Sequence, residues 1–287
     1  MTPVDYRDQT TLITGASSGI GAEFARRLAG RGSHLVLVAR REQRLRQLSG
    51  ELAATYGVRV TPIPLDLSQP AAGERLADEV ASRELTVTSL VNNAAFGTFG
   101  PFHQEDPGRL RDEIAVDVAA VVDISRAFID RLRAGGTGVL VNVASLAGFQ
   151  PSPNMAVYAA TKAFVLHFTE ALWHENRGTG LRVLALSPGA TETEFFEVLG
   201  THAADGGMRR QSVTAVVTTA LRALDRRNPP PSVVSGTVNR IAANGHRLLG
   251  RRQTVNLSGR ITRYEATAEA GGGGPDRVAA RGGQLPA

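Results

Sequence analysis

Cysteine is absent from the sequence, lysine occurs once, and aromatic residues make up only 5% of the 287 positions. Without cysteine the chain forms no disulfide, thiolate metal site, iron–sulfur cluster or cysteine nucleophile. No apolar run reaches the length of a membrane-spanning helix, and the first residues lack the charged-then-apolar order of a signal peptide. We therefore expect an unprocessed cytoplasmic protein without a metal site.

Hydrophobic residues make up 42% of the chain, which is enough for a substantial core and excludes a disordered or fibrous protein. Short β-branched runs alternate with stretches of helical period. The expected strands are residues 10–14, 34–39, 58–65, 88–91, 138–143, 182–186 and 232–234. The expected helices are residues 20–29, 42–56, 70–83, 109–133, 155–177 and 213–226. This alternation predicts one α/β domain, a doubly wound seven-stranded parallel sheet flanked by helices.

Positive charge is concentrated near the C-terminus, within a total of 32 basic and 27 acidic residues. Residues 236–263 contain no acid and carry the arginines Arg240, Arg247, Arg251, Arg252, Arg260 and Arg263. A basic stripe interleaved with aromatic residues is missing, as is any recognisable nucleic-acid-binding module. We expect no nucleic-acid partner.

The composition divides the chain into a folded domain (1–235), a basic helical extension (236–265) and a flexible glycine-rich tail (266–287). For the extension three roles stay open. It packs on its own or a partner subunit, it contacts an anionic membrane surface, or it is a solvated helix.

A glycine-rich turn follows the first expected strand and opens the first helix. Its glycines are Gly15, Gly19 and Gly21, and the turn also contains Ser17, Ser18 and Ile20. Glycine permits a sharp turn and a close approach of pyrophosphate, while free N–H groups of the following helix meet the phosphate charge. The position between strand and helix predicts a dinucleotide site, against the alternative of an ordinary tight turn.

The second expected strand ends at Arg40 and Arg41, where NAD-selective sheets usually carry an acid. A guanidinium suits a 2′-phosphate, so Arg40, with Arg41 and Ser17, predicts NADP(H) as cofactor. The alternative is that both arginines begin a solvated helix.

Polar residues follow the third and fourth expected strands as well. Asp66, followed by Leu67, can accept a hydrogen bond from an adenine amino group. Asn93 and Ala94 are expected at the cofactor, whereas Asn92 is interpreted as a structural residue that ties adjacent strands together.

Ser145 ends the fifth expected strand, and Tyr158 and Lys162 lie one helical turn apart in the next helix. Lys162 is the single lysine in an arginine-rich chain, which indicates a chemical need for an amine. A phenol has a pKa near 10, and a neighbouring ammonium lowers that value while a serine supplies a hydrogen bond. Each of Ser145, Tyr158 and Lys162 alone is explained by an ordinary structural role, but the three together are a specific signal.

In this order the motifs resemble the classical short-chain dehydrogenase/reductase family, NADP(H)-preferring type, over about residues 8–235. The resemblance implies a single Rossmann-like domain in which Tyr158 exchanges the proton of the substrate oxygen. Lys162 would lower the pKa of Tyr158 and hold the nicotinamide ribose, and Ser145 would bind the carbonyl oxygen. Cofactor contacts are also implied for Pro188, Gly189, Thr191 and Thr193.

Two positions depart from the family pattern. Ala95 stands where the family usually has glycine, a change we expect the fold to tolerate. Asp117 stands where the family has its fourth catalytic residue, an asparagine whose main-chain carbonyl anchors a water of a proton relay. We expect Asp117 to be functional, either ionised beside Lys162 or protonated in place of the asparagine donor.

The expected activity is NADP(H)-dependent hydride transfer between nicotinamide and a lipophilic ketone, aldehyde or secondary alcohol. The substrate walls are expected at residues 96–102, at residues 147–154 and in a lid (192–210) that carries Phe195, Phe196 and Leu199. Alternatives are a non-catalytic NADP(H) sensor or scaffold, or an imine reductase, dehydratase or epimerase. The resemblance implies a homodimer or homotetramer formed by the helices after the fourth and fifth strands.

Overall fold

The computed structural model describes residues 4–200, 207–245 and 249–262. A seven-stranded parallel sheet forms its centre, in the order β3-β2-β1-β4-β5-β6-β7. The strands are β1 (Thr10–Thr14), β2 (His34–Ala39), β3 (Val60–Pro64), β4 (Ser89–Asn92), β5 (Val139–Val143), β6 (Arg182–Ser187) and β7 (Ser232–Val234). The predicted doubly wound, Rossmann-like sheet is confirmed, with strand ends that differ from the sequence prediction by one or two residues.

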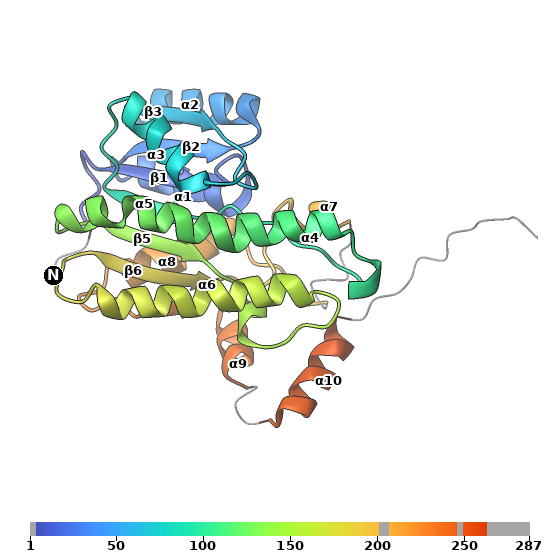
Figure 1. Cartoon of the computed structure of the whole chain (residues 1–287). Coiled ribbons are helices and arrows are strands. Elements are labelled where there is room, and N and C mark those ends of the chain that lie inside the picture. The colour runs from blue at the N-terminus through green and yellow to red at the C-terminus, as the bar shows by residue number, and fades with distance from the viewer. Residues whose placement is uncertain (1–3, 201–206, 246–248, 263–287) are drawn as a thin grey trace, which may run out of the picture.

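Helices cover both faces of the sheet because the central strands are apolar on both sides. On one face lie α1 (Gly19–Ala29), α2 (Glu42–Tyr56) and α8 (Val213–Leu224). On the other lie α3 (Ala72–Ser82), α5 (Ala120–Ala134) and α6 (Ala156–Glu175), of which α5 and α6 cross the front in Figure 1. Fully buried side chains such as Phe24 on α1 and Phe128 on α5 anchor the two layers.

The helix predicted over residues 109–133 is present over residues 107–134 and contains a π-helical turn. α4 (Pro107–Ile114) begins at Asp106, whose side chain caps the helix by accepting from the Arg109 N–H at 2.6 Å. A π-helical turn over Ala115–Ala119 then joins α4 to α5. Such turns insert one residue into a helix and often mark functional sites. Asp117 lies in this turn.

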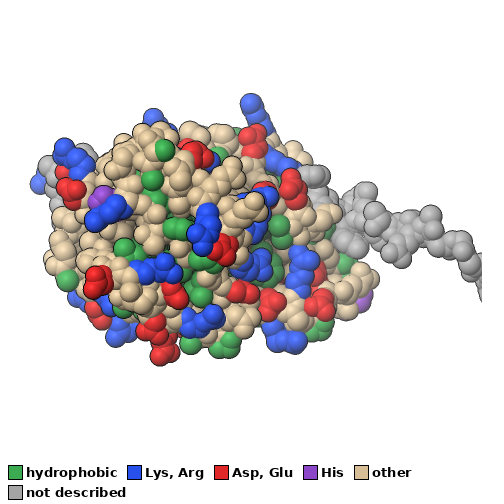
Figure 2. Space-filling model, turned by 90° about the horizontal axis from the view of Figure 1, so that it is seen from above, with side chains coloured by type: hydrophobic (Ala, Val, Ile, Leu, Met, Phe, Trp, Pro, Cys, Tyr) green, Lys and Arg blue, Asp and Glu red, His purple; other side chains and the backbone are tan. Residues whose placement is uncertain are grey.

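Strand order reverses between β1 and β4, which places a crevice at the carboxyl ends of the strands. Three further helices lie at this end: α7 (Phe195–Leu199), α9 (Thr237–Gly245) and α10 (Arg251–Ile261). None of the helices in the described residues is long and apolar enough to cross a membrane. On the face shown in Figure 2, basic and acidic side chains are interspersed rather than gathered by sign.

The basic extension packs on its own chain, which is one of the roles that the sequence left open. The Thr262 hydroxyl, just after α10, donates to the Pro153 carbonyl at 2.8 Å, and the Asn154 amide donates to the Thr262 carbonyl at 2.7 Å. Val238 and Ile241 on α9 stay 75% and 69% exposed, so this face of the extension has no cover from the described residues. The predicted tail (266–287) lies outside the described residues.

Candidate active site

A cavity of about 470 Å³ runs along the carboxyl ends of the strands. Its walls contain nearly all of the residues predicted from the sequence for cofactor and catalysis: Gly15, Ser17, Ser18, Gly19, Ile20, Arg40, Asp66, Leu67, Asn93, Ala94, Ser145, Tyr158, Lys162, Pro188, Gly189, Thr191 and Thr193. Gly21 and Asp117 do not line it, but Gly21 packs against Asn93 and Asp117 pairs with Lys162, both of which do. The fold thus brings residues from both halves of the sheet into one elongated cavity.

The glycine turn is packed too tightly for any side chain. A methyl group at Gly15 would lie 2.8 Å from the Ala94 Cα atom, and one at Gly21 would lie 2.5 Å from Nδ2 of Asn93. Asn93 in turn donates to the Thr14 carbonyl at 3.0 Å, which fixes the turn against the end of β4. Gly15 has a positive φ of 64°, so glycine is also required by the backbone.

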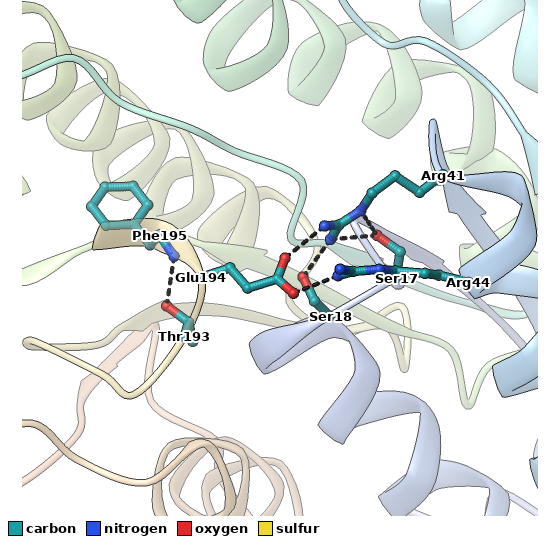
Figure 3. Close-up of polar contacts among 7 residues, drawn as sticks. All are labelled: Ser17, Ser18, Arg41, Arg44, Thr193, Glu194 and Phe195. Atoms are coloured by element: carbon teal, nitrogen blue, oxygen red, sulfur yellow. Dashed lines mark hydrogen bonds and ion pairs between the residues drawn. The ribbon is translucent and has the colours of Figure 1, made fainter. Parts of the chain in front are cut away.

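A pair of arginines lies beside the serine residues of this turn. Figure 3 shows Arg41 and Arg44, at the start of α2, gathered around the carboxylate of Glu194 from the loop after β6. Arg41 lies 2.6 Å from Glu194, Arg44 also pairs with Glu194, and Arg41 donates to the hydroxyls of Ser17 and Ser18 at 3.0 and 2.8 Å. Hydrogen bonding to Arg41 holds the pKa of Glu194 below its usual value. The guanidinium groups of Arg41 and Arg44, with the serine hydroxyls that Arg41 contacts, form a site for an anion. The carboxylate of Glu194 occupies this site.

Arg40 and Asn92 differ in their position relative to the cavity. Arg40 lines the cavity, as Asp66 does, but Arg41 rather than Arg40 donates to the serine hydroxyls. Asn92 is fully inside the sheet, where its amide donates to Asn142 on β5 at 2.9 Å and to Ser125 on α5 at 3.0 Å. The structural interpretation of Asn92 is therefore confirmed.

The chemical end of the cavity is formed by Ser145 after β5 and by Tyr158 and Lys162 on α6. The Lys162 ammonium lies 5.6 Å from the centre of the Tyr158 ring and donates to the Val143 carbonyl at 3.4 Å. Gly97 packs on the other side of the ring, where a methyl group would lie 2.9 Å from Cδ2 of Tyr158. The phenol is thereby fixed between α6 and the loop after β4.

Lys162 forms a buried ion pair with Asp117. Its Nζ atom lies 3.1 Å from Oδ2 of Asp117, and the two side chains are 2% and 0% exposed. The Phe96 N–H donates to Oδ1 of the same carboxylate at 3.1 Å. Burial raises the pKa of Asp117, and the charge of Lys162 acts against that shift. The π-helical turn thus places a carboxylate where the resemblance implied an asparagine.

This ion pair changes the expected chemistry of Tyr158. The resemblance implied that Lys162 lowers the pKa of Tyr158, but in the structure that pKa is raised. Burial is the main cause, the charge of Asp117 adds to it, and the Ser145 hydroxyl acts against it. Burial, with the charge of Asp117 adding to it, therefore favours the phenol over the phenolate.

The match to known proteins agrees with this arrangement. Residues 9–204 match the family model described as short chain dehydrogenase. The chain belongs to the short chain dehydrogenase family. It is an oxidoreductase of the kind that acts on alcohols or carbonyl compounds with a nicotinamide cofactor.

Relatives of this dehydrogenase include sulfoacetaldehyde reductase 2 of Chromohalobacter salexigens, which is 39% identical over 64% of this chain and 73% of its own length. Among solved structures, a 7beta-hydroxysteroid dehydrogenase superposes with a TM-score of 0.79 at 27% identity, covering 90% of this chain and 100% of its own. A short-chain dehydrogenase from Sphingobium yanoikuyae in complex with NADPH gives a TM-score of 0.74 at 34% identity, covering 92% and 99%.

Part of the cavity wall of this dehydrogenase comes from segments that sequence reasoning did not connect with the site. Ser258, Ile261 and Thr262 of the extension line the cavity, together with Ala242 on α9 and Met208. Of the expected walls, Phe96, Phe195 and Phe196 line the cavity as predicted, and the Phe195 ring lies 5.2 Å from that of Tyr158. Phe102 is 66% exposed and outside the wall, and Val198 takes the place expected for Leu199.

Sequence reasoning also missed Arg44 and Glu194, because a contact between residues 150 positions apart has no local signal. Ala95 is exposed on the cavity wall, so its additional methyl group displaces no packed atom. Glu113, a fully buried acid one turn before Asp117, was missed as well.

Proposed function

We propose that this enzyme is an NADPH-dependent carbonyl reductase with Tyr158 as the proton donor. The observation that carries the proposal is the convergence of Ser145, Tyr158 and Lys162 at one end of a cavity whose other end holds the glycine turn and Arg41. Bound NADPH supplies the hydride. The Ser145 hydroxyl lies next to the substrate oxygen and orients this oxygen toward the Tyr158 hydroxyl, which donates the proton.

The proposed direction of reaction agrees with the protonation of Tyr158. A phenol whose pKa is raised by burial and by Asp117 stays protonated at neutral pH. Reduction of a carbonyl requires a protonated donor, whereas oxidation of an alcohol requires a base. The raised pKa of Tyr158, caused mainly by its burial, therefore supports reduction as the proposed direction.

Selectivity for NADPH over NADH is proposed to rest on Arg41, Arg44 and the hydroxyls of Ser17 and Ser18. A planar guanidinium with adjacent hydroxyls suits the 2′-phosphate that distinguishes NADPH. No acid of the kind that selects NAD stands at the end of β2. Glu194 shares the arginines, and we propose that the 2′-phosphate takes over these contacts when NADPH binds.

The substrate is proposed to be a lipophilic ketone or aldehyde, because the wall around Tyr158 is built from Phe96, Met155, Phe195, Phe196 and Ile261. As a homodimer or homotetramer, the enzyme would associate through α4, α5 and α6, on which Ile114 and Phe164 are 47% and 42% exposed. Light scattering of the purified protein measures that assembly.

The test of the proposed function is consumption of NADPH and of NADH by the full-length enzyme across a panel of apolar ketones and aldehydes. The expected result is alcohol product, identified by mass spectrometry, with a kcat/KM that is higher for NADPH. Binding of NADPH without turnover of any carbonyl compound would contradict the reductase assignment, and faster turnover with NADH would contradict the role of Arg41.

A further inference from the structure

Glu113 is a buried acid for which the proposed function has no use. Its side chain lies on α4, one turn before Asp117, and is 0% exposed. Neither of its carboxyl oxygens has a hydrogen-bond partner in good geometry among the described residues, and the Thr98 hydroxyl is the uncharged polar group that approaches them. Burying a carboxylate without a partner is costly, so an acid in this position is kept neutral by a proton or serves a function.

The groups that face Glu113 come from three elements. Asp117 lies in the π-helical turn, Lys162 lies on α6, and Thr98 and Glu105 lie in the segment between β4 and α4. Burial raises the pKa of Glu113 to about 7, and the charges of Asp117 and Glu105 add to the shift. The Thr98 hydroxyl and Lys162 act against it.

The charge balance of this site requires one proton. Asp117 and Glu113 are two buried carboxyls one helical turn apart, and Asp117 pairs with the Lys162 ammonium at 3.1 Å. If both carboxyls ionise, the site carries a net negative charge away from water, whereas one shared proton makes it neutral. The two acids therefore titrate as one unit, and the neutral arrangement keeps a proton next to Lys162.

Thr98 and Glu105 adjoin this site. The Thr98 side chain is buried, and its hydroxyl acts to lower the pKa of both Glu113 and Glu105. Glu105 is half-buried, with Oε1 enclosed and without a partner. A hydroxyl both accepts and donates a proton, so Thr98 is able to connect the two carboxyls.

We propose that Glu113 is a relay residue that stores a proton beside the Lys162–Asp117 pair and recovers it from solvent through Thr98 and Glu105. The proposal rests on the proposed reductase function. For each carbonyl reduced, Tyr158 gives one proton to the substrate oxygen. That proton is replaced from the Lys162–Asp117–Glu113 unit, and the unit regains one proton from water by way of Glu105, so that every group returns to its starting state.

The discriminating variant is Glu113→Gln, which keeps the side-chain shape and removes the exchangeable proton. We expect kcat above neutral pH to fall by about tenfold or more, while the single-turnover rate of hydride transfer stays unchanged because Tyr158 is already protonated. Added small acids should restore turnover. Asp112→Asn, at the exposed neighbouring position of α4, is the matched control and should leave both rates unchanged.

Two further measurements keep the proposal testable if Glu113→Gln folds poorly. Thr98→Val removes the hydroxyl at constant volume and should lower kcat above neutral pH in the same way. Independently of activity, infrared difference spectra recorded on either side of neutrality should contain the carbonyl band of a protonated carboxylic acid in the wild type, and the band should be lost in Glu113→Gln.

An active wild type whose pH profile and infrared spectrum are unchanged by Glu113→Gln would overturn the relay. That result is distinct from failure of the proposed function, in which the wild type itself would bind NADPH without reducing any carbonyl compound. Full turnover of Thr98→Val above neutral pH would also contradict the path through Glu105.

Discussion

Lys162 and Asp117 form an ion pair of 3.1 Å that is fully enclosed between α6 and the π-helical turn. The pair fixes the only lysine of the chain beside Tyr158, and the charge of Asp117 adds to the burial that raises the pKa of the phenol. An asparagine at position 117 would remove the carboxylate that pairs with Lys162. After burial, which is the main cause, the residue at this position of the π-helical turn thus contributes to the raised pKa of Tyr158.

Asp117→Asn should therefore shift the pH dependence of reduction. Removing the carboxylate lowers the pKa of Tyr158, so the loss of kcat/KM at alkaline pH should begin at a lower pH than in the wild type. Stability should fall by about 3–5 kcal/mol, because Lys162 loses its buried partner. Stopped-flow kinetics across pH, together with urea unfolding, check both effects, and an unchanged alkaline limb would refute the coupling.

Arg41→Ala should weaken NADPH binding by about tenfold and leave NADH binding nearly unchanged. The expected loss of binding free energy is about 1.4 kcal/mol. This is at the low end for a charged hydrogen bond, because the Arg41 side chain is partly exposed to solvent. Fluorescence titration with each cofactor measures the two dissociation constants. The control is Arg46→Ala, since Arg46 lies on the same helix and pairs only with the exposed Glu42 among the described residues.

The companion variant Glu194→Gln should act in the opposite direction. It removes the carboxylate that shares Arg41 and Arg44, so the dissociation constant for NADPH should decrease while that for NADH changes less. Equal changes for both cofactors would show that the arginines do not meet the 2′-phosphate.

Gly97→Ala should impair catalysis without unfolding the enzyme. The new methyl group would meet the Tyr158 ring at 2.9 Å and the Phe195 ring at 3.2 Å, so the phenol must move. Displacement of a catalytic group by a fraction of an ångström to an ångström costs up to about a hundredfold in kcat. Gly50→Ala on α2 meets no atom within 4 Å and should instead stabilise the fold by about 0.5–1 kcal/mol, with full activity.

Glu113 makes a specific contribution to the pH dependence of stability. Its pKa is raised from 4.5 to about 7 in the folded state, so between these values the folded chain binds more protons than the unfolded chain. Stability should thus fall by roughly 3 kcal/mol as pH rises through this window. Denaturant unfolding of the wild type and of Glu113→Gln at several pH values isolates the effect, and parallel curves would contradict it.

The sheet, its helices and most of the cavity wall follow from local sequence signals. Strand and helix periods, the glycine turn and the Tyr158–Lys162 spacing depend on neighbouring residues, so the sequence predicts them well. The π-helical turn was not predicted because no proline or glycine in residues 109–133 signals a break, and the insertion is stabilised by the tertiary contacts of Asp117.

Long-range contacts account for the remaining differences. Arg41 and Glu194 meet because the loop after β6 folds back over the start of α2, and α10 reaches the substrate wall because Thr262 bonds to Pro153. Glu113 was missed because an acid on a charged, amphipathic helix is normally solvated, and only the packed structure places it inside.

The most direct test of the account is NADPH-dependent ketone reduction by the wild type and by Tyr158→Phe, with NADPH affinity measured in parallel. The account predicts that the variant binds NADPH as the wild type does and loses reduction by at least about a hundredfold, because the phenol supplies the proton. Retention of substantial reductase activity by Tyr158→Phe would contradict the mechanism built on Tyr158.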